Sequence, residues 1–282
     1  MARRSPAQPP GKPRLGAAAL IALLAAGCQP APTAAPSLPL SRVPPFATTP
    51  YEPFSRAETV AIALREWHAW GDRVDDAAPD GRPEPLAQNK PERQPGLWQR
   101  VGEYWWTGQD PGNEDGAWTG KHDAAGHVFP ASEDEDYAWS AAFISYVMRI
   151  AGAGPRFPYA PNHATYINLA RQASLGQVTG LAISAEPIDT TAPAAGDLIC
   201  MGRNRARSLR LEDLPAGRFP GHCDIVISVA PSQLAVIGGN VFDAVTMRHV
   251  PITDAGTLAP PNGPALDTRY PWFVVIRVHY DE

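Results

Sequence analysis

The feature that most constrains the fold of this chain is a change in the spacing of its apolar residues after Thr190. Before that point, apolar side chains recur at the spacing of three and four residues that is typical of helices. These helical segments span residues 55–71, 96–108, 138–152 and 164–173. After it, apolar residues alternate with polar ones or form short runs between turns, which favours strands. These strand-like segments span residues 196–201, 222–229, 233–239, 244–252 and 272–280. Helices followed by consecutive strands predict an α+β fold, in which N-terminal helices pack on a small antiparallel sheet or half-barrel.

Local signals mark the ends of several predicted helices. Ser55 and Glu58 have the spacing of a capping box, and Gly71 follows the last apolar residue of the same segment. The polar, proline-rich stretch 74–95 then predicts a loop. In the helix over 138–152, a hydroxyl stands at the start, because Ser140 precedes the continuous apolar run.

Size and charge narrow the class of protein. A chain of 282 residues with 44% hydrophobic content is long enough to bury a substantial core. Its formal net charge of -5 argues against a general nucleic-acid binder, which normally carries a basic excess. We therefore expect no nucleic-acid partner.

The N-terminus has the pattern of an export signal. Basic residues, among them Arg3 and Arg14, precede an apolar run over 15–26 that is too short to span a bilayer as a mature helix. This predicts a signal peptide over residues 1–27. The run ends in LLAAGC, which resembles the lipobox of bacterial lipoproteins, where cleavage leaves the cysteine, here Cys28, as the lipidated first residue. A secreted protein with an incidental cysteine is the alternative.

The residues after Cys28 predict a tether. Residues 28–53 are rich in proline and alanine, with almost no charge and no periodicity, so they are expected to be extended. Residues 54–282 are then expected to form a single α+β domain. Since Gln29 rather than aspartate follows the cysteine, the lipobox resemblance implies a lipid anchor at the periplasmic face of the outer membrane.

Four short motifs resemble a known group of enzymes. WSAAFISYVM, GDLI, GHCDIVISV and VIGGN occur in this order between residues 137 and 250. They look like the NlpC and CHAP groups of papain-like cell-wall hydrolases, whose catalytic cysteine opens a helix and whose histidine opens a strand. The resemblance implies a papain-like domain in the cell envelope that acts on peptidoglycan or muropeptides. The chain also resembles a bacterial family of unknown function in which serine is usual at the nucleophile position.

That resemblance assigns roles to three residues. Ser140 stands at the position of the nucleophile, His222 at that of the general base, and Asn240 is the expected third group, with Asp243 as its substitute. A helix N-terminus stabilises an anion by about 0.3 to 2 kcal/mol, which lowers a pKa by at most roughly one and a half units. This favours a thiolate but cannot ionise an alcohol, so a serine needs proton removal by the histidine.

Three interpretations of Ser140 remain open. The serine is a nucleophile, or it belongs to a site that has kept binding and lost hydrolysis, or it only caps the helix. The corresponding functions are hydrolysis of amide bonds in peptidoglycan stem peptides by acyl transfer, and non-catalytic binding or scaffolding by a lipoprotein of the same fold. Neither requires a cofactor.

Further side chains are candidates for substrate contacts. Trp139 adjoins the serine and His163 lies in a loop that can border the groove, although a core tryptophan and a capping histidine are the alternatives. Arginines between residues 202 and 220 are candidates to hold carboxylates of a peptide stem or anionic lipid headgroups. A solvated loop balanced by Glu212 and Asp213 explains them equally well.

The remaining cysteines are expected in the core. Strand alternation puts Cys223 on the apolar face of its strand, and Cys200 lies in an apolar run on what we expect to be the adjacent strand. A disulfide and two buried thiols are both consistent with this pattern. His122, Asp123 and His127 lie close together, but no further ligand pair at metal-binding spacing accompanies them, so we expect no metal site.

Overall fold

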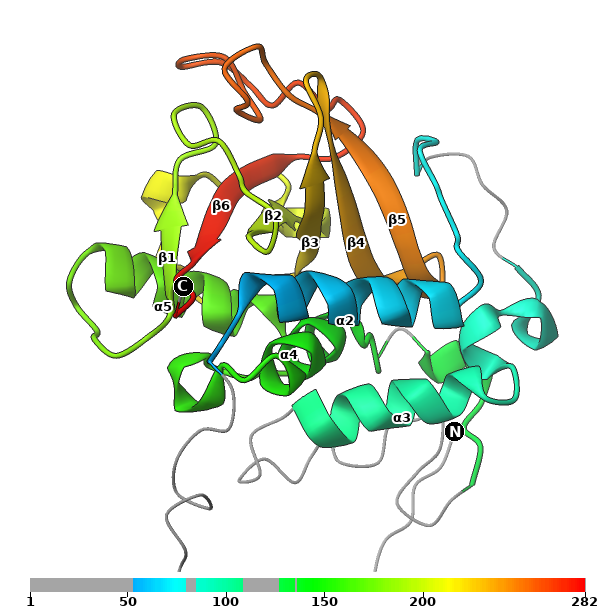
Figure 1. Cartoon of the computed structure of the whole chain (residues 1–282). Coiled ribbons are helices and arrows are strands. Elements are labelled where there is room, and N and C mark those ends of the chain that lie inside the picture. The colour runs from blue at the N-terminus through cyan, green and yellow to red at the C-terminus, as the bar shows by residue number, and fades with distance from the viewer. Residues whose placement is uncertain (1–52, 80–84, 109–126, 135, 282) are drawn as a thin grey trace, which may run out of the picture. The chain divides into compact units, whose positions relative to one another are not determined.

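The computed structural model in Figure 1 describes residues 53–79, 85–108, 127–134 and 136–281. The chain divides into two units, Met1–Thr48 and Thr49–Glu282, and the described residues belong to the second. The predicted signal peptide, Cys28 and the tether up to residue 52 lie outside them, as do His122 and Asp123. In the part that is described, no helix has the length and apolar character needed to cross a membrane.

The four predicted helices are confirmed. They are α2 (Arg56–Ala69), α3 (Leu97–Gly108), α4 (Ser140–Ile150) and α5 (His163–Ser174). Polar caps determine where two of them begin: the Ser55 side chain accepts a hydrogen bond from the backbone N–H of Glu58, and Asn162 does the same for Thr165. The helix starts predicted from the sequence therefore have a local physical cause.

The strands form one antiparallel sheet, which confirms the α+β class. They are β1 (Ile183–Glu186), β2 (Leu198–Gly202), β3 (Gly221–Val229), β4 (Gln233–Val241), β5 (Ala244–Pro251) and β6 (Trp272–Val278). Their order across the six-stranded sheet is β1-β6-β2-β3-β4-β5. Five of these strands were predicted; β1, which pairs with β6 at one edge, was missed.

Both faces of the sheet are covered. Helices α2, α4 and α5 pack on one face, and α3 packs against α4 from outside (Figure 1). The core between them contains Phe143 of α4 and Ile225 of β3, both without exposed surface. A smaller core lies on the opposite face, where Leu258 from the segment before β6 contacts the cluster around Val226. The sheet is thus buried on both sides, which explains its near-continuous apolar runs.

A disulfide joins the two central strands. Cys200 of β2 and Cys223 of β3 are direct partners in the sheet, with Cα atoms 4.1 Å apart, and both are fully buried. The prediction that these cysteines are internal neighbours on adjacent strands is confirmed. Of the two states that the sequence left open, the disulfide is the one present.

Reduction of this disulfide should destabilise the protein. The bridge closes a loop between residues 23 apart in sequence, and such a cross-link stabilises the folded state by about 3 kcal/mol through the unfolded chain. We expect dithiothreitol to lower the free energy of unfolding in urea by about that amount. The double variant Cys200→Ala, Cys223→Ala serves as control, because its stability should not respond to the reductant. Equal stability of the natural chain with and without reductant would contradict the prediction.

Candidate active site

A pocket of about 960 Å³ brings together the residues singled out in the sequence. Its walls come from the start of α4, the start of α5, the ends of β3 and β4 that face them, and the loop between β2 and β3. Ser140, His163, His222 and Asn240 all line it. Residues that are 100 positions apart in sequence thus share one site.

The hydroxyl of Ser140 contacts His163. Its Oγ lies 2.6 Å from Nε2 of His163, within hydrogen-bond distance, and Ser140 is the first residue of α4. The hydrogen bond that we expected between Ser140 and His222 is not the one formed, because the first residue of α5 carries its imidazole to the serine instead. Both side chains are buried, each about 4% exposed.

His163 is held on its other side by Tyr166. Nδ1 of the imidazole hydrogen-bonds the Tyr166 hydroxyl, which lies one helical turn further along α5. Burial, together with the charges of His222 and Arg203, holds the pKa of His163 well below its usual value. Burial also raises the pKa of Tyr166 well above that of a free phenol. The pair is therefore a neutral imidazole and a neutral phenol at neutral pH.

A neutral imidazole donates one hydrogen bond and accepts one. The direction of the hydrogen bonds from Tyr166 through His163 to Ser140 therefore decides whether the serine is activated. When Nδ1–H donates to the Tyr166 oxygen, Nε2 accepts the proton of Ser140 and acts as a base. When the phenol donates to Nδ1, Nε2–H donates to the serine oxygen instead. Only the first arrangement activates the hydroxyl.

His222 has a carboxylate partner. Its Nε2 lies 2.8 Å from Oδ1 of Asp224, whose other oxygen accepts hydrogen bonds from Arg248 on β5. Burial alone would raise the pKa of Asp224, but the charges and hydrogen bonds of Arg248 and His222 outweigh it and lower this pKa. Asp224 is therefore ionised. Burial is also the main cause that lowers the pKa of His222, against the pull of Asp224. The neutral ring donates Nε2–H to the carboxylate and keeps Nδ1 as an acceptor.

The two histidines form a close pair. Their ring centroids lie 5.4 Å apart, which explains why His222 helps to lower the pKa of His163. In the described part of the chain, the Nδ1 atom of His222 has no hydrogen-bond partner. The site therefore holds two neutral imidazoles, one on the serine and one oriented by a carboxylate.

The expected third group occupies a different position. Asn240 has a positive φ of 53° near the end of β4 and lines the pocket, but within the described residues its side chain bonds neither histidine. Asp243, the substitute, lies 3.6 Å from the ammonium of Lys90. The carboxylate on His222 is Asp224, two residues along the same strand face. The sequence signal for it was this spacing.

Trp139 is a core residue rather than a pocket residue. It has no exposed surface, stacks on Trp70 with ring centroids 5.1 Å apart, and donates its indole N–H to Glu92 over 2.6 Å. The expectation that it contacts substrate does not fit this burial. Trp105 of α3 lines the pocket instead.

The described residues contain no cluster of three or more side chains suited to a metal ion. This finding does not extend to His122 and Asp123, which lie outside them.

A substitution at Gly238 should separate His222 from Asp224. A Cβ at this position would lie 1.9 Å from Oδ1 of Asp224 and 3.0 Å from Nε2 of His222. Because Arg248 holds the carboxylate in place, Gly238→Ala must displace the pair and should cost about 1 to 3 kcal/mol of stability. Gly217→Ala is the matched control, since nothing lies within 4 Å of its added methyl group. Equal stability of the two variants would contradict the close packing described here.

Acid should destabilise the fold through the buried histidines. The pKa of His163 is lower in the folded than in the unfolded state. Between these two pKa values, the unfolded chain therefore binds one proton more than the folded chain. Stability should be greatest above pH about 6.5 and fall below it, by up to about 1.4 kcal/mol per pH unit for each such histidine. Urea unfolding between pH 8 and 5 measures this slope. His163→Gln should reduce it, and an unchanged slope in that variant would refute the assignment.

Residues 92–278 match the family described as uncharacterized proteins conserved in bacteria (DUF2272). No curated protein and no solved structure matches the chain. The matched segment contains all four helix and strand ends that line the pocket and both histidines of the site. Because it covers most of the sequence, the chain belongs to the DUF2272 family.

Proposed function

We propose that this protein is a cell-envelope lipoprotein that hydrolyses amide bonds in peptidoglycan stem peptides, with a papain-like domain of the NlpC and CHAP type. One observation carries the proposal. The hydroxyl of Ser140, at the start of α4, contacts the neutral imidazole of His163 inside a pocket. The sequence motifs supply the substrate class, and the lipobox supplies the location at the periplasmic face of the outer membrane.

The reaction begins with transfer of a proton. Nε2 of His163 takes the hydroxyl proton as Ser140 Oγ attacks the carbonyl carbon of the substrate, and an oxyanion forms. The first backbone N–H groups of α4 have no partner within the helix, and the side chain of the N-cap residue Trp139 does not cap them, so they are suited to bind this oxygen.

The tetrahedral intermediate then collapses to an ester. The carbon–nitrogen bond breaks, and His163 returns its proton to the leaving amine. Water, deprotonated by the same imidazole, attacks the ester and releases the acid, which restores the serine hydroxyl.

His222 is the alternative base. The sequence resemblance assigns this role to the strand histidine, and Asp224 fixes its tautomer with Nδ1 as the proton acceptor. The contact with Ser140 favours His163, whereas the carboxylate partner favours His222. When His163 is the base, His222 helps to keep it neutral, because protonation of two neighbouring rings is unfavourable.

A non-catalytic binding lipoprotein is the second candidate. It is favoured by the burial of Ser140 and by the partner of His163, because a phenol readily donates to Nδ1 and so leaves Nε2 without a lone pair for the serine proton. A carboxylate in place of Tyr166 would have excluded that arrangement.

Three chains compared on the same purified sacculi test the proposal: the natural protein, Ser140→Ala and Ser140→Cys. A serine nucleophile predicts release of stem-peptide fragments by the natural protein, and a loss of about a thousandfold or more in the alanine variant. Chromatography and mass spectrometry of the soluble products measure this. His163→Gln and His222→Gln then identify the base, since the true base variant should lose activity to a similar extent.

Equal release by the natural protein and Ser140→Ala would refute the role of Ser140. Release by Ser140→Cys alone would indicate a site that has kept its binding geometry and lost its nucleophile, because the helix end and an imidazole suffice to activate a thiol. No release by any of the three would favour the binding lipoprotein.

A further inference from the structure

The loop over residues 203–220, which we call the arginine loop, connects β2 to β3 and forms one wall of the pocket. Resting on the proposed function, we propose that it is a subsite for a carboxylate of the substrate, so that the site recognises stem peptides that carry a free carboxylate near the scissile bond. Four of its arginines line the pocket: Arg203, Arg205, Arg207 and Arg218.

The loop is built as a fixed part of the domain. Three of its apolar side chains are buried in the main core: Ala206, Leu214 and Phe219. Asn168 of α5 holds it through two hydrogen bonds with the backbone of Ala216, each 2.8 Å long. At its base, a Cβ on Gly202 would lie 1.8 Å from the backbone oxygen of Ala206, so the turn is closed tightly. The arginines are therefore held on an anchored backbone.

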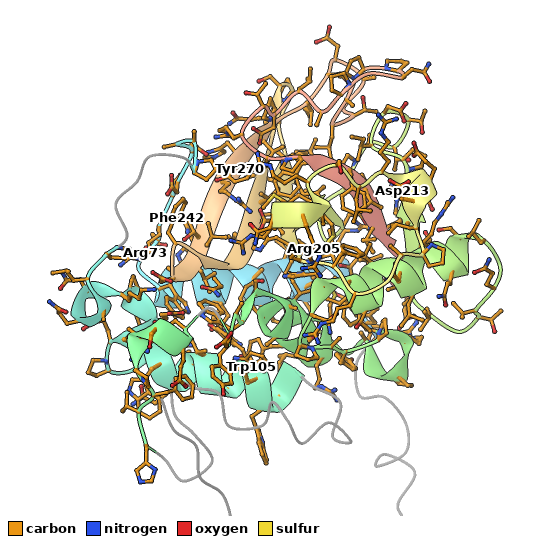
Figure 2. All side chains as sticks on the ribbon, turned by 180° about the vertical axis from the view of Figure 1, so that it is seen from behind. Arg73, Trp105, Arg205, Asp213, Phe242 and Tyr270 are labelled. Carbon is orange, nitrogen blue, oxygen red and sulfur yellow. A yellow bond between two sulfur atoms is a disulfide. The ribbon has the colours of Figure 1, made fainter. Side chains whose placement is uncertain are left out.

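The positive charge of this wall is not balanced within the loop. All four pocket arginines are exposed. The two acidic residues of the loop engage Arg210 instead: Glu212 lies 3.7 Å from its guanidinium, and Asp213 accepts from its backbone N–H. Arg210 does not line the pocket. In the view of Figure 2, the label of Arg205 lies between those of Phe242 and Asp213.

Carboxylates from other described segments do not pair with three of the four pocket arginines either. In the described ranges, no carboxylate lies within ion-pair distance of Arg205, Arg207 or Arg218. Four acids elsewhere line the pocket: Glu92, Asp134, Asp136 and Asp243. Asp134 and Asp243 each lie 3.6 Å from the ammonium of Lys90, and Glu92 accepts a hydrogen bond from Trp139. Exposed guanidinium groups converging on a pocket favour a planar, bidentate anion such as a carboxylate.

The subsite also connects to the serine. The charge of Arg203 is one of the causes that lower the pKa of His163. An anion bound to the arginine loop offsets that charge and makes His163 a stronger base when substrate is present. Substrate recognition and proton transfer are thereby coupled through one arginine.

Binding of soluble muropeptides tests the subsite. The probe is the mixture released from sacculi by a muramidase, used as such and after carbodiimide amidation of its carboxylates. The full chain carries Ser140→Ala in every sample, so that binding is measured by calorimetry without turnover. The double variant Arg205→Gln, Arg207→Gln is compared with Arg210→Gln, an arginine of the same loop that lies outside the pocket lining.

We expect the double variant to bind the untreated muropeptides about tenfold more weakly, a change of about 1.4 kcal/mol, and Arg210→Gln to bind them normally. Amidation should weaken binding to the natural loop by a similar factor and have little effect on the double variant. Thermal unfolding verifies that the exposed substitutions leave the fold intact.

Several results would overturn the subsite. One is that the double variant binds untreated muropeptides as tightly as the natural loop does. Another is that the natural loop binds amidated and untreated fragments equally well, and a third is that it binds neither. If the double variant lost binding to phosphatidylglycerol vesicles but bound muropeptides as the natural loop does, the loop would contact lipid instead. Carboxylate-dependent binding without cleavage of sacculi by the natural chain would refute the hydrolase and leave the subsite standing.

Discussion

The position of the site depends on the burial of α4. This helix lies between the sheet and α3, and nine of its eleven residues are buried, from Ser140 to Met148. A helix that is apolar on all sides has no freedom to rotate or slide, because each alternative would expose part of the core. Its first residue is therefore fixed beside the strand ends that supply His222 and Asn240, and α5 needs only to bring His163 to the same point.

The second constraint is a buried ionic cluster. Asp224, Arg248 and His222 are each no more than 2% exposed, and the guanidinium lies 4.4 Å from the ring centroid of Tyr270. Removal of one member of such a pair leaves an uncompensated charge and costs about 3 to 5 kcal/mol, whereas an apolar replacement of the whole pair is often tolerated. Stability alone does not require the cluster. Its arrangement does orient a pocket histidine, which is a reason to retain it.

Periodicity was sufficient to predict most of the architecture. The helices and five strands have long apolar patterns, whereas Ile183–Glu186 is four residues long and has only two fully buried positions. That strand is defined by pairing with β6, almost a hundred residues later, which no local signal encodes. Its absence from the prediction follows from the dominance of tertiary pairing over local pattern in short strands.

The site was predictable only where a local sequence signal marks a residue. Ser140 was recognisable because a hydroxyl stands where an apolar helix begins, and His222 because it opens a strand. The contact with His163 arises from how α5 packs, 23 residues further on, and the sequence does not specify that packing. Asp224 was within reach of the strand alternation, but the motif resemblance directed attention to Asn240.

The disulfide lies at the base of the arginine loop. Cys200 and Cys223 are paired two residues before Gly202 and two after Gly221, the positions where the loop leaves and rejoins the sheet. A cross-link there keeps the two stems of the loop in register, although the loop carries like charges that repel one another. Since such bonds form and persist in oxidising compartments, the two stems would be cross-linked only after export, if the chain is exported as we propose. Under the same proposal, a newly made chain in the cytosol would carry the arginine loop on stems that are held by strand pairing alone.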